Sequence, residues 1–345
     1  MCVLVGGQYG SEGKGAIAAH LADRYQVHVR VGSPNAGHTI HWNGEKHVMQ
    51  TIPCGWTNPD ASIVIGRGAL INLRLLKEEL EHIEQYYPDF RRHLFIDCKA
   101  GVLDERFHEE EGGVDGEMHR RIGSTGEGVG PARIARLQRD RDKFCLFEDV
   151  AEKHGLEDCM TDDTPSFIAT MQDCGYDVLI EGTQGSGLSL LHSHWPYCTT
   201  VDTNAAGIIA EVGVAPSRVT DVLMVCRTYP IRVAGNSGPM RREITWGEVS
   251  KRAKRPVEER TTVTKKVRRV AEWDVGLFNQ SCTLNAPTEI ALTFCDYVDP
   301  KLYGETSVAR IAKSKKLARF LTDNGLYGKI KYFGTGPDSV AEIGE

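Results

Sequence analysis

The chain has 345 residues, of which 41% are hydrophobic and 26% are charged, and its net charge is −6. This composition excludes a disordered tail, and the acidic balance argues against general nucleic-acid binding. The apolar run at the N-terminus is too short for a signal peptide, and no later run approaches the roughly 18 apolar residues of a membrane span. We therefore expect a cytoplasmic globular protein without a nucleic-acid or membrane partner.

Short β-rich runs alternate along the chain with segments of helical period. Apolar residues at helical spacing follow the first run, and a second stripe follows Asn72, a plausible N-cap. The alternation predicts an α/β fold with a mostly parallel central sheet and helices on both faces. No linker or repeat interrupts it, so we expect one domain over residues 1–345. The runs are CVLVGG, VHVRVGS, SIVIGRG, LFIDCKAG, DVLIEGTQG, DVLMVCRTYP, IALTFCD and KIKYFGTGP, and the first stripe is Ile17, Leu21 and Tyr25.

The first glycine-rich loop, GGQYGSEGKG at residues 6–15, stands between a predicted strand and a predicted helix. This arrangement presents backbone N–H groups to a phosphate, and Lys14 would reach the terminal phosphates. The loop departs from the Walker A pattern, because five residues separate Gly7 from Gly13 and because Gly15, instead of serine or threonine, follows the lysine. A bare turn with a surface lysine is the alternative.

Further loops follow later strands. His38, in SPNAGHT, is flanked by glycine and threonine and is expected to transfer a proton. The loop IGSTGEGVGPA at 122–132 has a glycine density that suits close approach to a ligand, although a structural Ω-type loop is the alternative. Gln184 follows another strand, and YCTT adds Thr199 and Thr200. Because such loops meet at the carboxyl edge of a parallel sheet, two phosphorylated ligands are expected there.

Two further segments and the cysteines can be interpreted without a catalytic role. The acidic stretch HEEEGGVDGEMHRR at 108–121 is interpreted as a solvated excursion. The segment 251–269 has nine basic and two acidic residues, which indicates either an anionic partner or a solvated basic face. The ten cysteines form no C-x-x-C pair, so buried free thiols are favoured over disulfides or zinc.

The order of seven motifs resembles that of the adenylosuccinate synthetases: GGQYGSEGKG, NAGHT, IGSTGEGVGPA, EGTQGSGLSL, PYCTT, TVTKKVRR and GTGPD. The resemblance covers nearly the whole chain, and the length matches the short archaeal and viral forms, which have a reduced helical region. It implies a P-loop-like fold and a ligase that requires Mg²⁺. In that family a nucleoside triphosphate phosphorylates O6 of a purine monophosphate, and the amine of L-aspartate then displaces the phosphate.

Ser11 departs from the family pattern, in which an aspartate takes the N1 proton of inosinate and meets the metal. The shorter, neutral serine leaves space for an amino group at purine position 2 and can accept a hydrogen bond from it. The resemblance is therefore to the phage branch of the family, the 2-aminoadenylosuccinate synthetases, which act on dGMP to supply 2-aminoadenine for DNA. Without the aspartate, water or the phosphoryl group itself takes the N1 proton.

The resemblance also implies roles by position. Catalysis is expected of Ser11, Lys14, Gln184 and of His38 as general acid. Mg²⁺ would contact Ser11 and the Gly37 carbonyl. The donor nucleotide would contact Ser11, Gly13, Lys14, Gly15, Gly37, His38, Thr39, Asp296, Gly334, Gly336 and Pro337. The acceptor dGMP would contact Ser11, Asn35, Ser124, Thr125, Gln184, Thr199, Val233, Lys266 and, from the partner in a homodimer, Arg139. Aspartate would contact Thr262, Val263, Thr264 and Arg268.

Two further departures bear on the substrates. Lys266 replaces an arginine near the ribose, a change that tolerates deoxyribose. The sequence TFCD at 293–296 replaces TKLD of the long enzymes that use GTP, so ATP or dATP is the expected donor. The expected substrates are thus dGMP, L-aspartate and ATP, in the cytoplasm of a phage host. The alternatives are a short adenylosuccinate synthetase that uses IMP and, from another class, a non-catalytic nucleotide-sensing or nucleic-acid-binding module.

Overall fold

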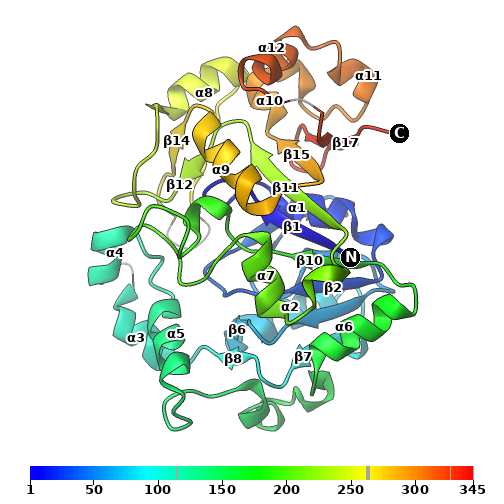
Figure 1. The fold of residues 1–345 in the computed structure, drawn as a ribbon, viewed down its shortest axis with the longest axis vertical. Helices are drawn as coiled ribbons and strands as arrows, with labels where there is room; N and C mark the ends of the chain where they lie inside the picture. Colours follow the sequence, from blue (N-terminus) through cyan, green and yellow to red (C-terminus); the bar gives the residue numbers. More distant parts are fainter. Residues whose placement is uncertain (114–115, 262–264, 327, 345) are drawn as a thin grey trace.

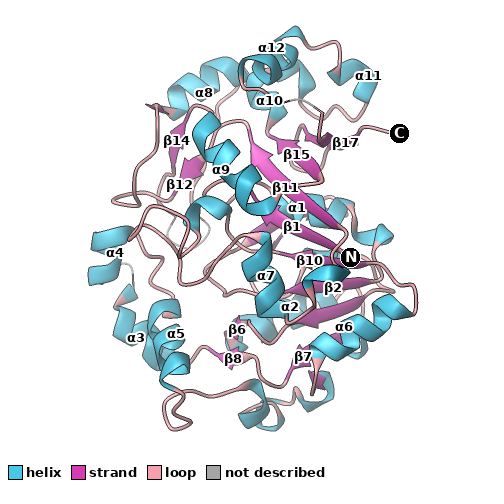
Figure 2. Cartoon of the chain, viewed as in Figure 1, coloured by secondary structure: helices cyan, strands magenta, loops and turns pink. Residues whose placement is uncertain are grey.

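A ten-stranded sheet forms the centre of the computed structural model, which describes residues 1–113, 116–261, 265–326 and 328–344 (Figures 1 and 2). All neighbouring strands are parallel except the last pair at one edge, β16 and β17. In spatial order the strands are β17 (Val340–Glu342), β16 (Ile330–Gly334), β15 (Glu289–Thr293), β11 (Asp221–Arg227), β1 (Cys2–Gly6), β10 (Val178–Glu181), β2 (Val27–Arg30), β5 (Ser62–Ile65), β7 (Leu94–Asp97) and β9 (Met160–Thr161).

The eight β-rich runs of the sequence are all strands of this sheet, so the predicted parallel α/β fold is confirmed. Strands β1, β2 and β10 are buried at every residue, as expected where helices cover both faces of a parallel sheet. The two edge strands that the sequence did not predict, β9 and β17, have only two and three residues. Such short strands carry no period that sequence reasoning can detect.

Helices cover both faces of the sheet. One core cluster contains residues of α1 and α2, and the second contains residues of α6, α7, α9 and α12 on the opposite face. Figure 1 shows α7 and α9 in front of the sheet. The helices are α1 (Lys14–His20), α2 (Leu73–Glu84), α3 (Glu105–Glu111), α4 (Glu117–Ile122), α5 (Val129–Gln138), α6 (Thr164–Asp173), α7 (Ala205–Val212), α8 (Trp246–Ala253), α9 (Val275–Asn285), α10 (Cys295–Val298), α11 (Val308–Ile311) and α12 (Lys315–Asp323).

The two helices predicted from apolar stripes are both present. Asn72 caps α2, because its side-chain oxygen accepts hydrogen bonds from the backbone N–H groups of Arg74 and Leu75. Helix α1 ends at His20, earlier than the stripe predicted. A 3₁₀ turn and extended backbone at Tyr25 follow, because the chain turns there to enter β2.

Two smaller units lie beyond the carboxyl ends of the central strands. One packs α3 and α5 around Phe107 and Phe144, and the other packs α8 against β12 (Ile231–Arg232) and β14 (Arg269–Ala271). Figure 1 shows both on the same side of the sheet, away from the N-terminus. Strand β14 also pairs with β13 (Glu243–Ile244). Two further pairs are β3 (His38–Trp42) with β4 (Glu45–Met49) and β6 (Leu70–Ile71) with β8 (Gly101–Val102).

Most described residues of segment 108–121 are exposed, in agreement with the solvated excursion that the sequence suggested. Its described residues belong largely to α3 and α4, and Glu111 is buried. Glu111 is the exception that the charge pattern did not reveal, because its carboxylate is buried against the loop at 122–130. Within the described ranges, no helix is long and apolar enough to cross a membrane. All ten cysteines are free thiols, but only six of them are buried as predicted, and Cys174 is exposed.

Candidate active site

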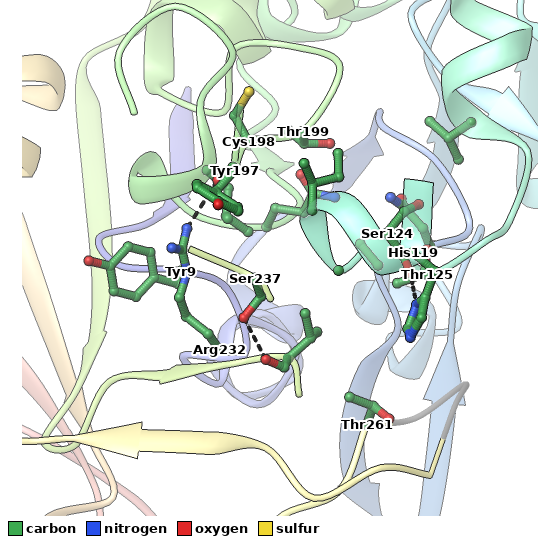
Figure 3. Close-up of a pocket in the computed structure, with 18 of the residues that line it drawn as sticks. Tyr9, His119, Ser124, Thr125, Tyr197, Cys198, Thr199, Arg232, Ser237 and Thr261 are labelled. Atoms are coloured by element: carbon green, nitrogen blue, oxygen red, sulfur yellow. Dashed lines mark hydrogen bonds between the residues drawn. The ribbon is translucent and has the colours of Figure 1, made fainter. Parts of the chain in front are cut away.

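A cavity of about 210 Å³ lies where the predicted loops meet (Figure 3). It brings together most residues that the sequence assigned to the acceptor nucleotide, although they come from segments far apart in the chain. Gly13, Gly15, Thr39, Arg139, Asp296 and residues 334–337 are not among its lining residues, and residues 262–264 lie outside the described part of the chain. The predicted residues that line it are Ser11, Lys14, Asn35, Gly37, His38, Ser124, Thr125, Gln184, Thr199, Val233, Lys266 and Arg268.

The first glycine-rich loop is held from inside by Glu12. Its fully buried carboxylate accepts hydrogen bonds from the N–H groups of Gln8 at 3.1 Å and Gly10 at 2.8 Å. The Lys14 ammonium lies 2.8 Å from the same carboxylate and also donates to the carbonyl of Gln184. Residues 10, 11 and 13 have positive φ angles, which curl the loop around this carboxylate. Lys14 is thereby fixed between two loops of the site.

Ser11 presents a neutral hydroxyl to the cavity. The Arg268 guanidinium donates to Ser11 Oγ at 2.8 Å, and the Arg227 guanidinium donates to the Ser11 carbonyl at 3.0 Å. Arg227 is itself paired with Glu259. Because a hydroxyl oxygen has two lone pairs, Ser11 Oγ keeps one acceptor position and its own hydrogen for a ligand. No carboxylate stands at position 11 to balance Arg268.

His38 lies at the start of β3 and is buried against Glu181, the last residue of β10. Its Nδ1 contacts a Glu181 oxygen, and that carboxylate also accepts from Arg30 at 3.3 Å and from the Cys54 N–H at 2.7 Å. Burial favours the neutral acid, but the hydrogen bond and charge of His38 and the charge of Arg30 outweigh it and lower the pKa of Glu181 to about 2. Glu181 is therefore ionised, so Nδ1 of His38 carries a hydrogen.

The resting imidazole of His38 is neutral. Burial, and next the positive charge of Arg30, lower the pKa of His38 from 6.5 to about 4. With Nδ1–H donated to Glu181, Nε2 is left as a hydrogen-bond acceptor. An anionic phosphoryl group next to this ring would raise its pKa and allow Nε2 to take up and pass on a proton. The arrangement suits proton transfer to a phosphorylated ligand.

The free energy of unfolding is expected to decrease as the pH falls, because His38 becomes protonated more readily in the unfolded state. Since the pKa of His38 is lowered on folding, the unfolded state binds the extra proton between pH 6.5 and about 4, and stability is lost as the pH falls through that window. Urea unfolding at pH 6.5, 5.5 and 4.5 measures this loss. His38→Gln, which does not titrate, is expected to have a shallower dependence on pH by about 1 kcal/mol or more over the window. Equal pH dependence for both proteins would contradict the assignment.

The loop at 122–130 is shaped by contacts from α3 and α4. The buried Glu111 carboxylate accepts from Ser124 Oγ and from the Gly128 N–H. His119 contacts the carbonyl oxygen of Ser124, as Figure 3 shows, and its other ring nitrogen lies 2.9 Å from the Lys266 ammonium. Two side chains of segment 108–121, Glu111 and His119, therefore determine the conformation in which the loop at 122–130 approaches the cavity.

The residues expected to bind the donor base gather at the ends of β15 and β16. Asp296, at the start of α10, is buried and forms an ion pair with Arg255. Burial raises the pKa of Asp296, and Arg255 opposes this shift. Thr293, at the end of β15, donates a hydrogen bond to the Glu12 carbonyl at 2.5 Å. Thr293 thus joins the expected donor-base region to the first loop.

The predicted metal ligands differ in how well they fit Mg²⁺, which prefers oxygen ligands, particularly charged ones. Gly37 lines the cavity, and its backbone carbonyl is an oxygen ligand of the kind that Mg²⁺ accepts. Ser11 Oγ fits poorly, because it already accepts a hydrogen bond from the cationic Arg268. Among the described residues, the only group of three possible metal-ligating side chains is His38, Cys54 and Glu181, a buried set with a single carboxylate. Phosphate oxygens of a bound nucleotide would have to supply most of the coordination.

Sequence reasoning missed several residues of the site. Glu181 was noted only as the start of a loop, although a carboxylate at the end of an apolar strand is a signal that could have identified it. The guanidinium carbon of the buried Arg232 lies 4.1 Å from the centre of the Tyr9 ring. Arg232 also donates a hydrogen bond to the carbonyl of Tyr197, two residues before Thr199. Nothing in their spacing connects these residues, because they are joined only by the fold.

A family model described as adenylosuccinate synthetase matches residues 3–157 and 147–303 of the chain. The adenylosuccinate synthetase of Methanococcus maripaludis is 35% identical over 344 residues, which cover 99% of this chain and 97% of that protein. The corresponding enzyme of Methanosphaera stadtmanae is 36% identical over 350 residues, with 99% and 96% covered. These similarities extend over essentially the whole chain.

Two solved structures are similar to this one. The succinoaminodeoxyadenylate synthetase of cyanophage S-2L, bound to dGMP and to dATP as an energy donor, has a TM-score of 0.83 and 29% identity, and covers 100% of this chain and 95% of that chain. The fully ligated adenylosuccinate synthetase of Plasmodium falciparum has a TM-score of 0.85 and 19% identity, with 99% of both chains covered. The second similarity bears on the fold alone.

Proposed function

The chain belongs to the adenylosuccinate synthetase family of carbon–nitrogen ligases, and within that family we propose that it joins L-aspartate to carbon 6 of dGMP, with ATP or dATP as the phosphate donor. The product would be the 2-amino-6-succinyl deoxynucleotide, released with ADP or dADP and phosphate. The observation that carries the proposal is the neutral Ser11 hydroxyl at the cavity wall. The similarity to the cyanophage enzyme, which is bound to dGMP, supports it. We further propose that residues 1–345 act as one unit in the cytoplasm of a phage host.

The reaction would proceed in two balanced steps. The γ-phosphoryl group passes from the donor to O6 of guanine, the N1 proton leaves to water or to a phosphoryl oxygen, and ADP or dADP is released. The amine of aspartate then attacks carbon 6, loses a proton, and the O6–C6 bond breaks as phosphate departs. Phosphorylation is needed because an oxo group is a poor leaving group, whereas phosphate departs readily.

The residues of the site would divide this work. Lys14, fixed by Glu12 and the Gln184 carbonyl, places one positive charge near the transferring phosphoryl group. His38, oriented by Glu181, takes a proton as the phosphates approach and donates it from Nε2 to the departing phosphate. Mg²⁺, held by the Gly37 carbonyl and the phosphates, would offset the charge that develops on them.

Ser11 would distinguish guanine from hypoxanthine. The 2-amino group of guanine adds a donor and volume beside N1, and Ser11 Oγ has a lone pair left to accept from it. Arg268 holds this oxygen in place from the side of the expected aspartate site. An aspartate at position 11 would be longer, would be charged, and would lie within ion-pair distance of Arg268, so it would occupy the space that the amino group needs.

The competing candidate is a short adenylosuccinate synthetase that uses IMP. It is favoured by the archaeal relatives, which are 35% and 36% identical to this chain. A direct test is to incubate the purified protein with aspartate, Mg²⁺ and ATP or dATP, together with equal concentrations of dGMP and IMP, and to identify products by mass. We expect the dGMP adduct to predominate. Conversion of IMP alone would establish the competitor, and absence of either product with nucleotide binding intact would indicate a non-catalytic protein.

We propose that the protein acts as a homodimer in which Arg139 serves the partner's site. Arg139 ends α5, is exposed, and does not line the cavity of its own chain. The same helix exposes 59% of Ile134 and 77% of Leu137. Large apolar side chains on one exposed helix are typical of a surface that another chain covers. The second copy would cover this face and gain a guanidinium for its nucleotide.

Shared sites predict recovery of activity when two inactive variants are mixed. Arg139→Ala and His38→Ala homodimers are each expected to lose most activity. After unfolding and refolding together, about a quarter of wild-type activity is expected, because half of the dimers pair unlike chains and each of these has one intact site. Size measurement by light scattering confirms that both variants dimerise. Failure of the mixed dimers to regain activity would contradict the role of Arg139, and a monomeric, fully active wild type would contradict the dimer.

A further inference from the structure

We infer that His119 is a positioning residue of the acceptor-nucleotide site, which holds the Lys266 ammonium as an uncompensated charge for the nucleotide's phosphate. The inference rests on the proposed function only in placing a nucleoside monophosphate in this cavity. His119 belongs to segment 108–121, and the resemblance to the family implies no role for it. Figure 3 shows its side chain beside Ser124 and Thr125 at the cavity wall.

The contacts of the ring define its chemical state. Nδ1 of His119 contacts the carbonyl oxygen of Ser124, which accepts hydrogen bonds but cannot donate one. Nδ1 therefore carries the hydrogen. The other nitrogen, Nε2, lies 2.9 Å from the Lys266 ammonium. Because an ammonium can only donate, Nε2 carries no hydrogen, and its lone pair accepts the hydrogen bond from Lys266. A single neutral tautomer satisfies both contacts.

His119 differs from the partners of most other cations in the basic segment 251–269, because it is neutral. Four arginines of 251–269 form ion pairs with carboxylates, and the charge of each is compensated. The two cations of the segment that line the cavity, Lys266 and Arg268, have no ion pair with any described residue and are held by neutral acceptors, His119 Nε2 and Ser11 Oγ. The arginines with carboxylate partners are Arg252, Arg255, Arg260 and Arg269.

A neutral acceptor fixes the position of a cation without cancelling its charge. Lys266 therefore keeps more of its attraction for an anion in the cavity than a carboxylate partner would leave it, and its long flexible side chain loses less freedom when the anion binds. The same imidazole bonds Ser124, which precedes Thr125 in the glycine-rich loop, so the charge stands on the side of the cavity expected to hold the nucleotide. Arg268, bonded to Ser11, stands on the aspartate side. The ribose, near which the family resemblance places residue 266, carries no charge, so the anion assigned to Lys266 is the 5′-phosphate attached to that ribose.

Two variants of equal size separate this role from a structural one. His119→Gln and His119→Glu both lose the bond to Ser124, but glutamine offers Lys266 a neutral oxygen, whereas glutamate offers a carboxylate that cancels its charge. Calorimetric titration with dGMP and with IMP, without donor or aspartate, measures affinity directly. We expect His119→Gln to bind within about threefold of wild type and His119→Glu about tenfold more weakly than His119→Gln. The ratio should be the same for both nucleotides, since they carry the same phosphate.

The same two variants of His119, each combined with Lys266→Met, complete the test. If His119 acts through the ammonium, the difference between the glutamine and glutamate variants becomes clearly smaller there, because only the direct repulsion between the new carboxylate and the phosphate remains. Arg121→Ala, which removes an exposed charge from the same helix, is the control and is expected to bind like wild type. Equal affinity of His119→Gln and His119→Glu with Lys266 intact, or a difference of unchanged size with Lys266→Met, would overturn the inference. Binding of IMP but not dGMP by the wild type would instead overturn the proposed substrate, and the comparison on IMP would still decide the role of His119.

Discussion

Replacement of His38 by alanine is expected to lower kcat for dGMP by about 10³-fold, with a change in KM of less than about threefold. The expectation follows from the geometry of the ring, which is buried, is oriented by Glu181 through Nδ1 and belongs to the cavity wall. A positioned general acid contributes on the order of 10²–10⁴-fold. Initial rates of phosphate release at saturating dGMP, aspartate and ATP measure the loss.

His41 provides the matched control, because it lies on the same strand as His38 but is exposed and outside the cavity. His41→Ala is expected to retain wild-type kcat. Glu181→Gln keeps an acceptor for Nδ1 but removes the negative charge that stabilises a protonated ring, so an intermediate loss of about 10²-fold is expected. Retention of activity within about fivefold by His38→Ala would contradict the role assigned to this residue.

Ser11→Asp is expected to lower kcat/KM for dGMP by about 10²-fold and to raise kcat/KM for IMP. The new carboxylate would pair with Arg268, which lies 2.8 Å from the present hydroxyl, and would fill the space assigned to the 2-amino group. The backbone should tolerate the change, because aspartate adopts the positive φ of 56° found at this position more readily than most residues. Steady-state kinetics with each nucleotide at saturating aspartate and donor provide the measurement.

Ser11→Ala separates volume and charge from hydrogen bonding. It preserves the neutral space and removes only the acceptor, so a loss of about fivefold to tenfold for dGMP is expected, consistent with about 1 kcal/mol for one hydrogen bond. Thermal unfolding of both variants checks that the loop is intact. Unchanged turnover of dGMP by Ser11→Asp would refute the explanation given for position 11, whatever its effect on IMP.

Local patterns predicted the framework of the protein well. The eight apolar runs gave the parallel strands because a buried strand needs apolar residues over only four or five positions. Asn72 gave the start of α2 because its capping partners are two and three residues away. The loops after β1, β2 and β10 could likewise be located, since in a parallel sheet every carboxyl end reaches the same edge, whereas the loop at 122–130 joins α4 to α5 and follows no strand.

Long-range polar contacts could not be predicted in the same way. The His38 contact with Glu181 spans 143 residues, and the His119 contact with Lys266 spans 147. No period or spacing connects such positions, and the acidic composition of 108–121 indicated a solvated segment when two of its side chains shape the loop at 122–130. Glu12 shows the same limit, because its carboxylate fills the interior of a loop that the sequence described only as a phosphate cradle.

The central claim concerns the space beside Ser11, and a crystal structure with dGMP and a non-hydrolysable ATP analogue tests it most directly. We expect the guanine base in the cavity with its 2-amino nitrogen within about 3.2 Å of Ser11 Oγ, and with Arg268 still bonded to that oxygen. A purine bound with its position 2 turned away from Ser11, or dGMP excluded from the cavity by neighbouring side chains, would contradict the account.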